Sequence, residues 1–169
     1  YLAEIGLTAE EADLLTSDGS VSRLFEDALD VHHDAKVVAN WIVNELSPYF
    51  ENGKADALPF GGAELGALVA LVASRTISGK IGKEILAIIV REGGDPGAIV
   101  AERGLEQVTD VSAVEPIVEQ VIAANPEKVE EYRSGRTGLA GFFVGQVMRE
   151  AGGTADPELV QRLVREKLC

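Results

Sequence analysis

The sequence predicts an all-α protein made of short helices, and three observations lead to that prediction. Apolar residues recur three and four positions apart along most of the chain, which is the spacing of a buried helix face. No segment alternates apolar and polar residues with the period of two that marks a half-buried strand. Capping residues precede several apolar runs, and three of them are followed by proline: Asp95-Pro96, Asn125-Pro126 and Asp156-Pro157.

Three helices are expected in residues 1–52. Thr8-Ala9-Glu10-Glu11 has the pattern of a capping box, which satisfies the first free N–H groups of a helix, so a short helix should follow it. Asp18-Gly19-Ser20 interrupts that helix, and a second apolar run extends over 21–29. The third helix should carry Trp41 on its buried face. We expect these helices to form a small acidic bundle.

A boundary is predicted after this bundle. The stretch from Glu51 to Gly62 contains Gly, Asp and Pro and shows no apolar period. We therefore expect a helical bundle at 1–52, a linker at 53–61 and a second helical domain at 62–169. Because the linker is polar, limited proteolysis should cut near Lys54 before it cuts within either part.

The second domain should consist of further short helices. Their apolar runs end at glycine, proline or a polar loop, and 104–110 is predicted as one such loop. The expected helices cover 63–73, 78–91, 96–103, 114–122 and 157–168, together with the stretch 125–156.

That last stretch concentrates glycine within a helical pattern. Asn125 should cap its first helix, and Gly138, Gly141 and Gly145 lie beside the apolar face of the second. Glycine inside a helix costs about 1 kcal/mol relative to alanine, so three of them need a reason. Either another helix packs closely there, or the backbone of another molecule approaches closely. The flanking cations are Arg133, Arg136 and Arg149.

The charge distribution restricts the partners of the chain. The net charge is −13, which argues against a general nucleic-acid-binding protein. Basic residues nevertheless gather between Arg75 and Arg91, where Lys80 and Lys83 stand three apart and so share a helix face. Ser78 is the expected cap of that helix, and a helix N-terminus offers N–H donors and a favourable dipole to phosphate.

No catalytic site is predicted. His32-His33 is an adjacent pair at a turn, which makes no metal site by itself, and Cys169 has no base beside it. Gly79-Lys80 is not followed by Ser or Thr, as a phosphate-binding loop requires. We therefore expect no cofactor and no metal. No apolar run is long enough to cross a membrane, and the single internal methionine, Met148, suggests that the chain is a fragment.

Several runs carry a resemblance to a known family. Residues 132–148, YRSGRTGLAGFFVGQVM, resemble the tail domain that the B subunit of the tRNA-dependent amidotransferase shares with the small YqeY proteins. Residues 76–84, TISGKIGKE, resemble an earlier signature of the same family, and 15–18 and 39–46 resemble the helical region before the tail. The resemblance therefore covers nearly the whole chain and implies an N-terminal three-helix bundle followed by a YqeY-like helical tail domain.

In that family the tail is taken to touch the outer corner of tRNA through its backbone. The resemblance thus implies a non-catalytic tRNA-binding appendage of a larger cytoplasmic enzyme that charges or amidates tRNA, with neither a membrane nor DNA as partner. The partners would be tRNA and the rest of the parent enzyme. The expected tRNA contacts are Lys80, Lys83, Arg133, Arg136, Gly141, Gly145 and Arg149.

One departure from the family pattern bears on the parent protein. Most of the lysines that the family carries in its glycine-rich segment are absent from 135–142 and 148–157. A similar tail is appended to some bacterial glutaminyl-tRNA synthetases, and the lysine loss favours that parent slightly over the amidotransferase. The alternative function is a protein-interaction module that docks on a partner subunit without touching RNA, and an independent enzyme ranks last.

Overall fold

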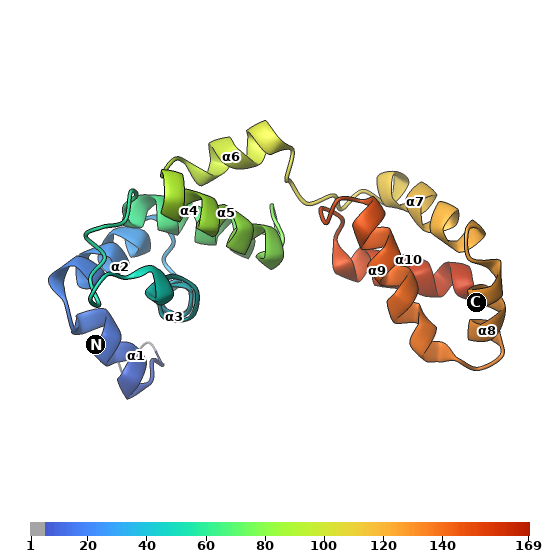
Figure 1. The fold of residues 1–169 in the computed structure, drawn as a ribbon, viewed down its shortest axis with the longest axis horizontal. Helices are drawn as coiled ribbons and strands as arrows, with labels where there is room; N and C mark the ends of the chain where they lie inside the picture. Colours follow the sequence, from blue (N-terminus) through green and yellow to red (C-terminus); the bar gives the residue numbers. More distant parts are fainter. Residues whose placement is uncertain (1–5) are drawn as a thin grey trace. The chain divides into compact units, whose positions relative to one another are not determined.

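The computed structural model describes residues 6–169, and over that range it contains helices and no strand. The prediction of an all-α fold is therefore confirmed. The helices form two compact units, one ending at Leu105 and the other running from Glu106 to Cys169. Figure 1 shows the helices of each unit, and each unit is described by itself.

Over residues 6–105, the first unit contains six α-helices. Helix α1 (Ala9–Thr16) begins at the predicted capping box, in which the Glu11 carboxylate accepts the Thr8 N–H at 2.7 Å. Helix α3 passes without a break into a π-helical turn and then a 3₁₀ turn, which the sequence analysis did not foresee. The elements after α1 are α2 (Gly19–Val31), α3 (Ala35–Asn40), η1 (Trp41–Leu46), η2 (Ser47–Tyr49), α4 (Gly62–Ala73), α5 (Gly79–Glu92) and α6 (Pro96–Arg103).

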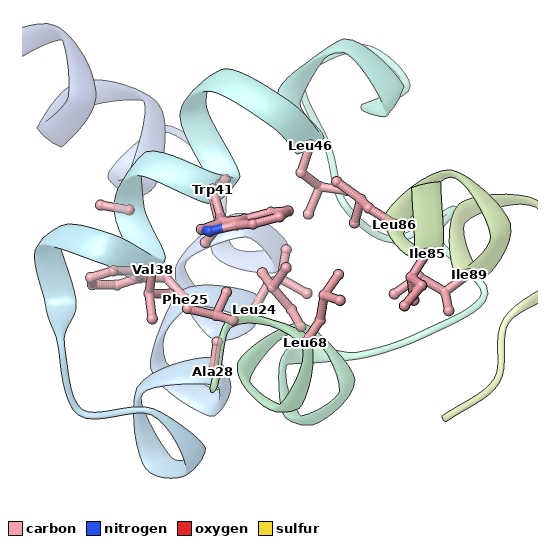
Figure 2. Packing of buried hydrophobic residues seen from close by; sticks show 14 of the residues in the cluster. Leu24, Phe25, Ala28, Val38, Trp41, Leu46, Leu68, Ile85, Leu86 and Ile89 are labelled. Carbon is pink, nitrogen blue, oxygen red and sulfur yellow. The ribbon is translucent and has the colours of Figure 1, made fainter. Parts of the chain in front are cut away.

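A single apolar core holds these helices together. Figure 2 shows the Trp41 ring among side chains from α2, α4 and α5. Trp41 is 7% exposed, so the prediction that it is buried is confirmed. Residues from Leu15 to Val100 contribute to this one core, which makes α1 to α6 one packing unit.

The contact between α2 and α4 depends on glycine. A Cβ built on Gly66 would lie 2.6 Å from the Ala28 carbonyl oxygen, and one built on Gly62 would overlap the Leu24 carbonyl oxygen. A real Cβ does not come that close to a backbone atom, so the two helix backbones approach as they do because both positions lack a side chain. Gly82 of α5 gives similar room to Trp41, whose Cη2 would lie 3.0 Å from an added Cβ.

The second unit contains four α-helices around its own core. They are α7 (Val111–Ala123), α8 (Pro126–Arg133), α9 (Ala140–Glu150), preceded by a 3₁₀ turn η3 (Thr137–Leu139), and α10 (Pro157–Leu168). Phe143 and Val147 of α9 are fully buried among apolar residues of α7 and α10. Lys167 of α10 pairs with Glu115 at 2.8 Å and with Glu119 at 2.6 Å, both on α7.

The compact units do not follow the predicted division at 53–61. That segment lies inside the first unit, where Ala55 is buried and its N–H donates to Ser20 Oγ of α2 at 2.9 Å. Helices α4 to α6 belong with α2 because Gly62 and Gly66 let α4 pack against it. The structure divides instead at the predicted loop 104–110. Leu105 packs against the first core, whereas Val108 N–H donates to Thr154 of the second unit at 2.7 Å.

Two smaller features complete the fold. Asn125 was expected to cap α8, but its side-chain amide donates backward to the Val121 carbonyl at 2.8 Å and makes no capping bond. This happens because Asn125 comes directly after Ala124, the C-cap of α7, where unsatisfied carbonyls need donors. Across residues 6–169, each helix is too short or too polar to span a lipid bilayer.

Candidate functional site

The N-terminus of α5 exposes a lysine and open backbone. Ser78 caps the helix as predicted, with its hydroxyl accepting the Ile81 N–H at 3.2 Å. Gly79 is the first helical residue, and an added Cβ there would have no atom within 4 Å. Lys80 follows it and is exposed. A phosphate could therefore reach the first free N–H groups without a steric barrier, and Lys80 would add a positive charge beside it.

The position of Lys80 is unfavourable for the helix itself. Helix N-termini favour carboxylates and disfavour cations, because the aligned peptide dipoles place positive charge there. The first turn of α5 contains no acidic residue, so this end of the helix keeps its positive potential. Within residues 6–169, no ion pair involves Lys80, whose charge is available to a partner. A position that breaks a local stability rule is a candidate for function.

Lys83 lies one turn further along α5 and already has a partner. Its Nζ is 2.8 Å from the Glu45 carboxylate of the π-helical turn η1. The lysine side chain remains 59% exposed, so solvent or a ligand can still reach it. Arg91 lies in the last turn of α5, far from the two lysines. The basic patch predicted for this helix therefore consists of Lys80 and Lys83 alone.

The glycines of α9 line an open face. Gly141 and Gly145 are four residues apart and therefore on one side of the helix, and Arg149 continues the same side one turn later. All three are exposed. A Cβ built on Gly141 or Gly145 would have no neighbouring atom within 4 Å, and the same holds for Gly138. Close helix packing within the second unit, one of the two reasons considered for these glycines, is therefore excluded.

The three arginines near this face have different surroundings. Arg133 donates through Nε to the Leu168 carbonyl at 3.2 Å and so caps the end of α10, which is a structural task. Arg136 Nη1 lies 2.7 Å from the Glu131 carboxylate. Arg149 stands in the last turn of α9, where a cation also favours the helix dipole, and it makes no ion pair with the rest of residues 6–169.

Three further side chains at these surfaces were not predicted. Lys128 of α8 lies over the Phe142 ring, with its Nζ 4.8 Å from the centroid, and so adds a cation beside α9. Glu45 and Glu131 each neutralise a predicted contact residue. Sequence spacing offers no signal for the pairing of Glu45 with Lys83, or of Lys128 with Phe142, because each joins separate elements.

The structure therefore divides the predicted contact residues into two groups. Lys80 and Lys83 lie on α5 of the first unit, and the arginines and glycines lie around α8 and α9 of the second unit. Neither group contains a nucleophile with an adjacent base, so the arrangement suits binding by shape and charge. Among the residues that the structure describes, His, Cys, Asp and Glu side chains do not gather into threes suited to a metal ion.

Comparison with known proteins relates the chain to one family. A family model described as the GatB domain matches residues 23–168. The B subunit of aspartyl/glutamyl-tRNA(Asn/Gln) amidotransferase from Rippkaea orientalis is 45% identical over 170 residues, which cover 99% of this chain and 34% of that protein. The protein of the same name from Rhizobium etli is 43% identical, with the same coverage.

A plant relative extends this result. The chloroplastic/mitochondrial B subunit of glutamyl-tRNA(Gln) amidotransferase from Oryza sativa subsp. japonica is 42% identical over 97% of this chain and 30% of its own length. The chain thus spans about a third of the length of the curated relatives it matches. All three relatives are named as amidotransferase subunits. They give no support to the glutaminyl-tRNA synthetase parent that the loss of lysines had favoured.

Proposed function

The chain belongs to the GatB/YqeY family, and from that premise we propose that it is a tRNA-binding, non-catalytic region of the B subunit of an amidotransferase. In this proposal the chemistry takes place elsewhere in a larger cytoplasmic enzyme. The region holds tRNA by its sugar–phosphate backbone and contributes to productive binding. The whole enzyme and its tRNA substrate are part of the same proposal, because the relatives named for those activities are about three times longer.

One observation carries the proposal: Gly141 and Gly145 form an open helix face that nothing within the second unit covers. Each glycine costs the helix about 1 kcal/mol relative to alanine, and no internal contact offsets that cost. A face without side chains lets the backbone of another molecule come close. Arg149 at the end of this face, and Lys128 beside it, supply positive charge for phosphates.

The α5 N-terminus supports the same proposal independently. Lys80, the exposed Gly79 and the free N–H groups of the first turn form a local positive region on an acidic protein. Few cations are involved, so the affinity for tRNA should be modest and should fall with salt. The expected slope is about 0.7 to 0.9 in log K per log salt for each neutralised phosphate.

A charge reversal on α5 tests the proposal. Lys80→Glu combined with Lys83→Glu should weaken binding of deacylated tRNA in a gel shift at low salt. In the full-length protein within its complex, the same change should raise KM for tRNA more than it lowers kcat, because the lysines bind tRNA and do not touch reacting atoms. Each single reversal, Lys80→Glu or Lys83→Glu, is also compared with Lys54→Glu, which makes the same change of charge in an exposed turn of the same unit. A folded double variant with unchanged binding and unchanged KM refutes a role for α5 in RNA contact.

A protein-interaction module is the second candidate, and a specific observation favours it. Glycines four residues apart on an open face can also receive a partner helix, and the net charge of −13 suits a basic protein better than RNA. The two candidates separate in one experiment. If the chain gives no gel shift with deacylated tRNA at low salt, yet co-purifies with the other subunits of the complex, the protein-docking function replaces the RNA function.

A further inference from the structure

We propose that Glu45 and Glu131 are built-in competitors of RNA phosphate, each holding one of the basic residues that would otherwise bind tRNA. This inference rests on the proposed function and concerns the strength of that binding. Two of the five predicted cationic contacts, Lys83 and Arg136, already form short ion pairs inside the chain. A phosphate must displace a carboxylate before it can use either cation.

The first pair joins two elements that are distant in sequence. Lys83 Nζ on α5 contacts Glu45 Oε1 on η1 at 2.8 Å. The Glu45 side chain is 27% exposed, whereas the Lys83 side chain is 59% exposed. The carboxylate is therefore the more buried partner, and the lysine is the one that solvent reaches more freely. Lys83 can turn to solvent without rearranging the core, which is what an exchangeable contact requires.

The second pair joins Glu131 in the last turn of α8 to Arg136 in the following loop, and two kinds of contact hold it. Arg136 Nη1 contacts Glu131 Oε2 at 2.7 Å, and the backbone N–H of Arg136 donates to the Glu131 carbonyl at 3.1 Å. Ser134 Oγ donates to the same carbonyl at 2.8 Å. The loop after α8 is thus folded over Glu131, and the guanidinium is directed toward that carboxylate. Its side chain is 74% exposed, so a phosphate can still reach it.

The size of the effect follows from the exposure of the pairs. Exposed ion pairs contribute little because water and salt screen them, so each should lower RNA affinity by roughly two- to fivefold. Among the predicted contact residues, this would leave Lys80 and Arg149, which have no ion pair within residues 6–169, as cations that no carboxylate neutralises and no backbone contact engages. The attenuation keeps binding weak and reversible, as suits a region that must release its RNA after each turnover.

The experiment removes each carboxylate while keeping its shape. Dissociation constants for fluorescently labelled deacylated tRNA are measured by anisotropy with the whole chain and its variants. Glu45→Gln and Glu131→Gln should each tighten binding by roughly two- to fivefold. Glu84→Gln and Glu130→Gln are matched controls: each removes the same charge next to a paired residue, at an exposed position without an ion pair among the described residues. They should change the constant much less.

A double-mutant cycle separates direct competition from a general change in charge. Glu45→Gln should have no effect in a chain that already carries Lys83→Met, and Glu131→Gln should have none beside Arg136→Met. If the gain persists in those backgrounds, or if the controls match it, the inference is overturned. If Glu45→Gln weakens binding, Glu45 orients Lys83 instead of competing for it, which also overturns the inference. If the unmodified chain and every variant fail to bind tRNA, the proposed function fails.

Discussion

Two glycine pairs in this molecule have the same spacing and opposite surroundings. Gly62 and Gly66 on α4, and Gly141 and Gly145 on α9, both stand four residues apart within a helix. In the first unit the backbone of α2 fills the space, and an added Cβ on Gly66 would lie 2.6 Å from a carbonyl oxygen. In the second unit an added Cβ would meet no atom within 4 Å.

The difference shows that glycine spacing alone does not reveal what the glycines are for. In α4 they let two helices of the same unit approach closely, and their cost to the helix is offset by packing. In α9 the cost is not offset within the second unit, and we propose that a contact with another molecule is the reason for these glycines. The first pair serves packing within its unit, the second is proposed to serve binding, and substitutions test both assignments.

The largest expected effect is at the packed pair. Gly66→Ala should lower the free energy of unfolding of the first unit by about 1 to 3 kcal/mol, because the new Cβ forces α4 away from α2. The higher helix propensity of alanine offsets up to about 1 kcal/mol of the loss. Fluorescence of Trp41, the single tryptophan, follows urea unfolding of this unit. An unchanged or higher urea midpoint would show that α2 and α4 can move apart at no cost. The close packing of these helices would then not explain Gly66.

The opposite sign is expected at the open pair. Gly145→Ala should stabilise α9 by about 0.5 to 1 kcal/mol, since alanine favours the helix and meets no neighbour. Hydrogen exchange of the α9 backbone amides measures this local stability. Faster exchange in the variant would mean that the face is covered in solution.

The sequence predicted the helices of both units well, because their signals are local. The capping box at Thr8, the cap at Ser78 and the Asp-Pro starts at Asp95 and Asp156 all depend on residues within one helical turn. The division of the chain was not predictable in this way. It depends on α4 packing against α2, a contact between residues about forty positions apart for which the glycine spacing looks the same as in α9.

The candidate site was predictable to a similar degree. Local pattern and family resemblance identified Lys80, the glycines of α9 and the arginines around them as expected contact residues, and the structure shows these residues exposed. They did not identify their partners. The pairing of Lys83 with Glu45, and the structural contact of Arg133 with Leu168, join elements that only the folded chain brings together.

A smaller difference between the units should appear at the two ends of the pH range. The Thr8 backbone N–H and Lys36 lower the pKa of Glu11 in the first unit. In the second unit, hydrogen bonds to Glu115 and Glu119 raise the pKa of Lys167. Glu11 therefore stabilises the first unit above its ordinary pKa of 4.5, and this contribution is lost as pH falls below that value. The Lys167 contribution is complete below 10.5 and is lost only as pH rises above it.

Single substitutions test the direction of each pH dependence. Glu11→Gln should lower stability near neutral pH and flatten the acid side of the stability curve followed by Trp41 fluorescence. Lys167→Met should weaken the second unit near neutral pH, seen as faster hydrogen exchange in α10, and leave the acid limb of the first unit unchanged. If the stability of the first unit falls just as steeply with decreasing pH in Glu11→Gln, other carboxylates cause that loss of stability.

The most direct test of the open face is the affinity of Gly141→Leu for deacylated tRNA, measured by fluorescence anisotropy at low salt. Leucine suits a helix better than glycine and has open space at this position, so circular dichroism should show an intact fold. Its side chain would keep an RNA backbone at a distance. The dissociation constant should rise by roughly tenfold, or about 1.4 kcal/mol, whereas Ala113→Leu, at an exposed position on α7, should leave it unchanged. If folded Gly141→Leu binds tRNA as tightly as the unmodified chain, the glycine face of α9 is not where RNA is held.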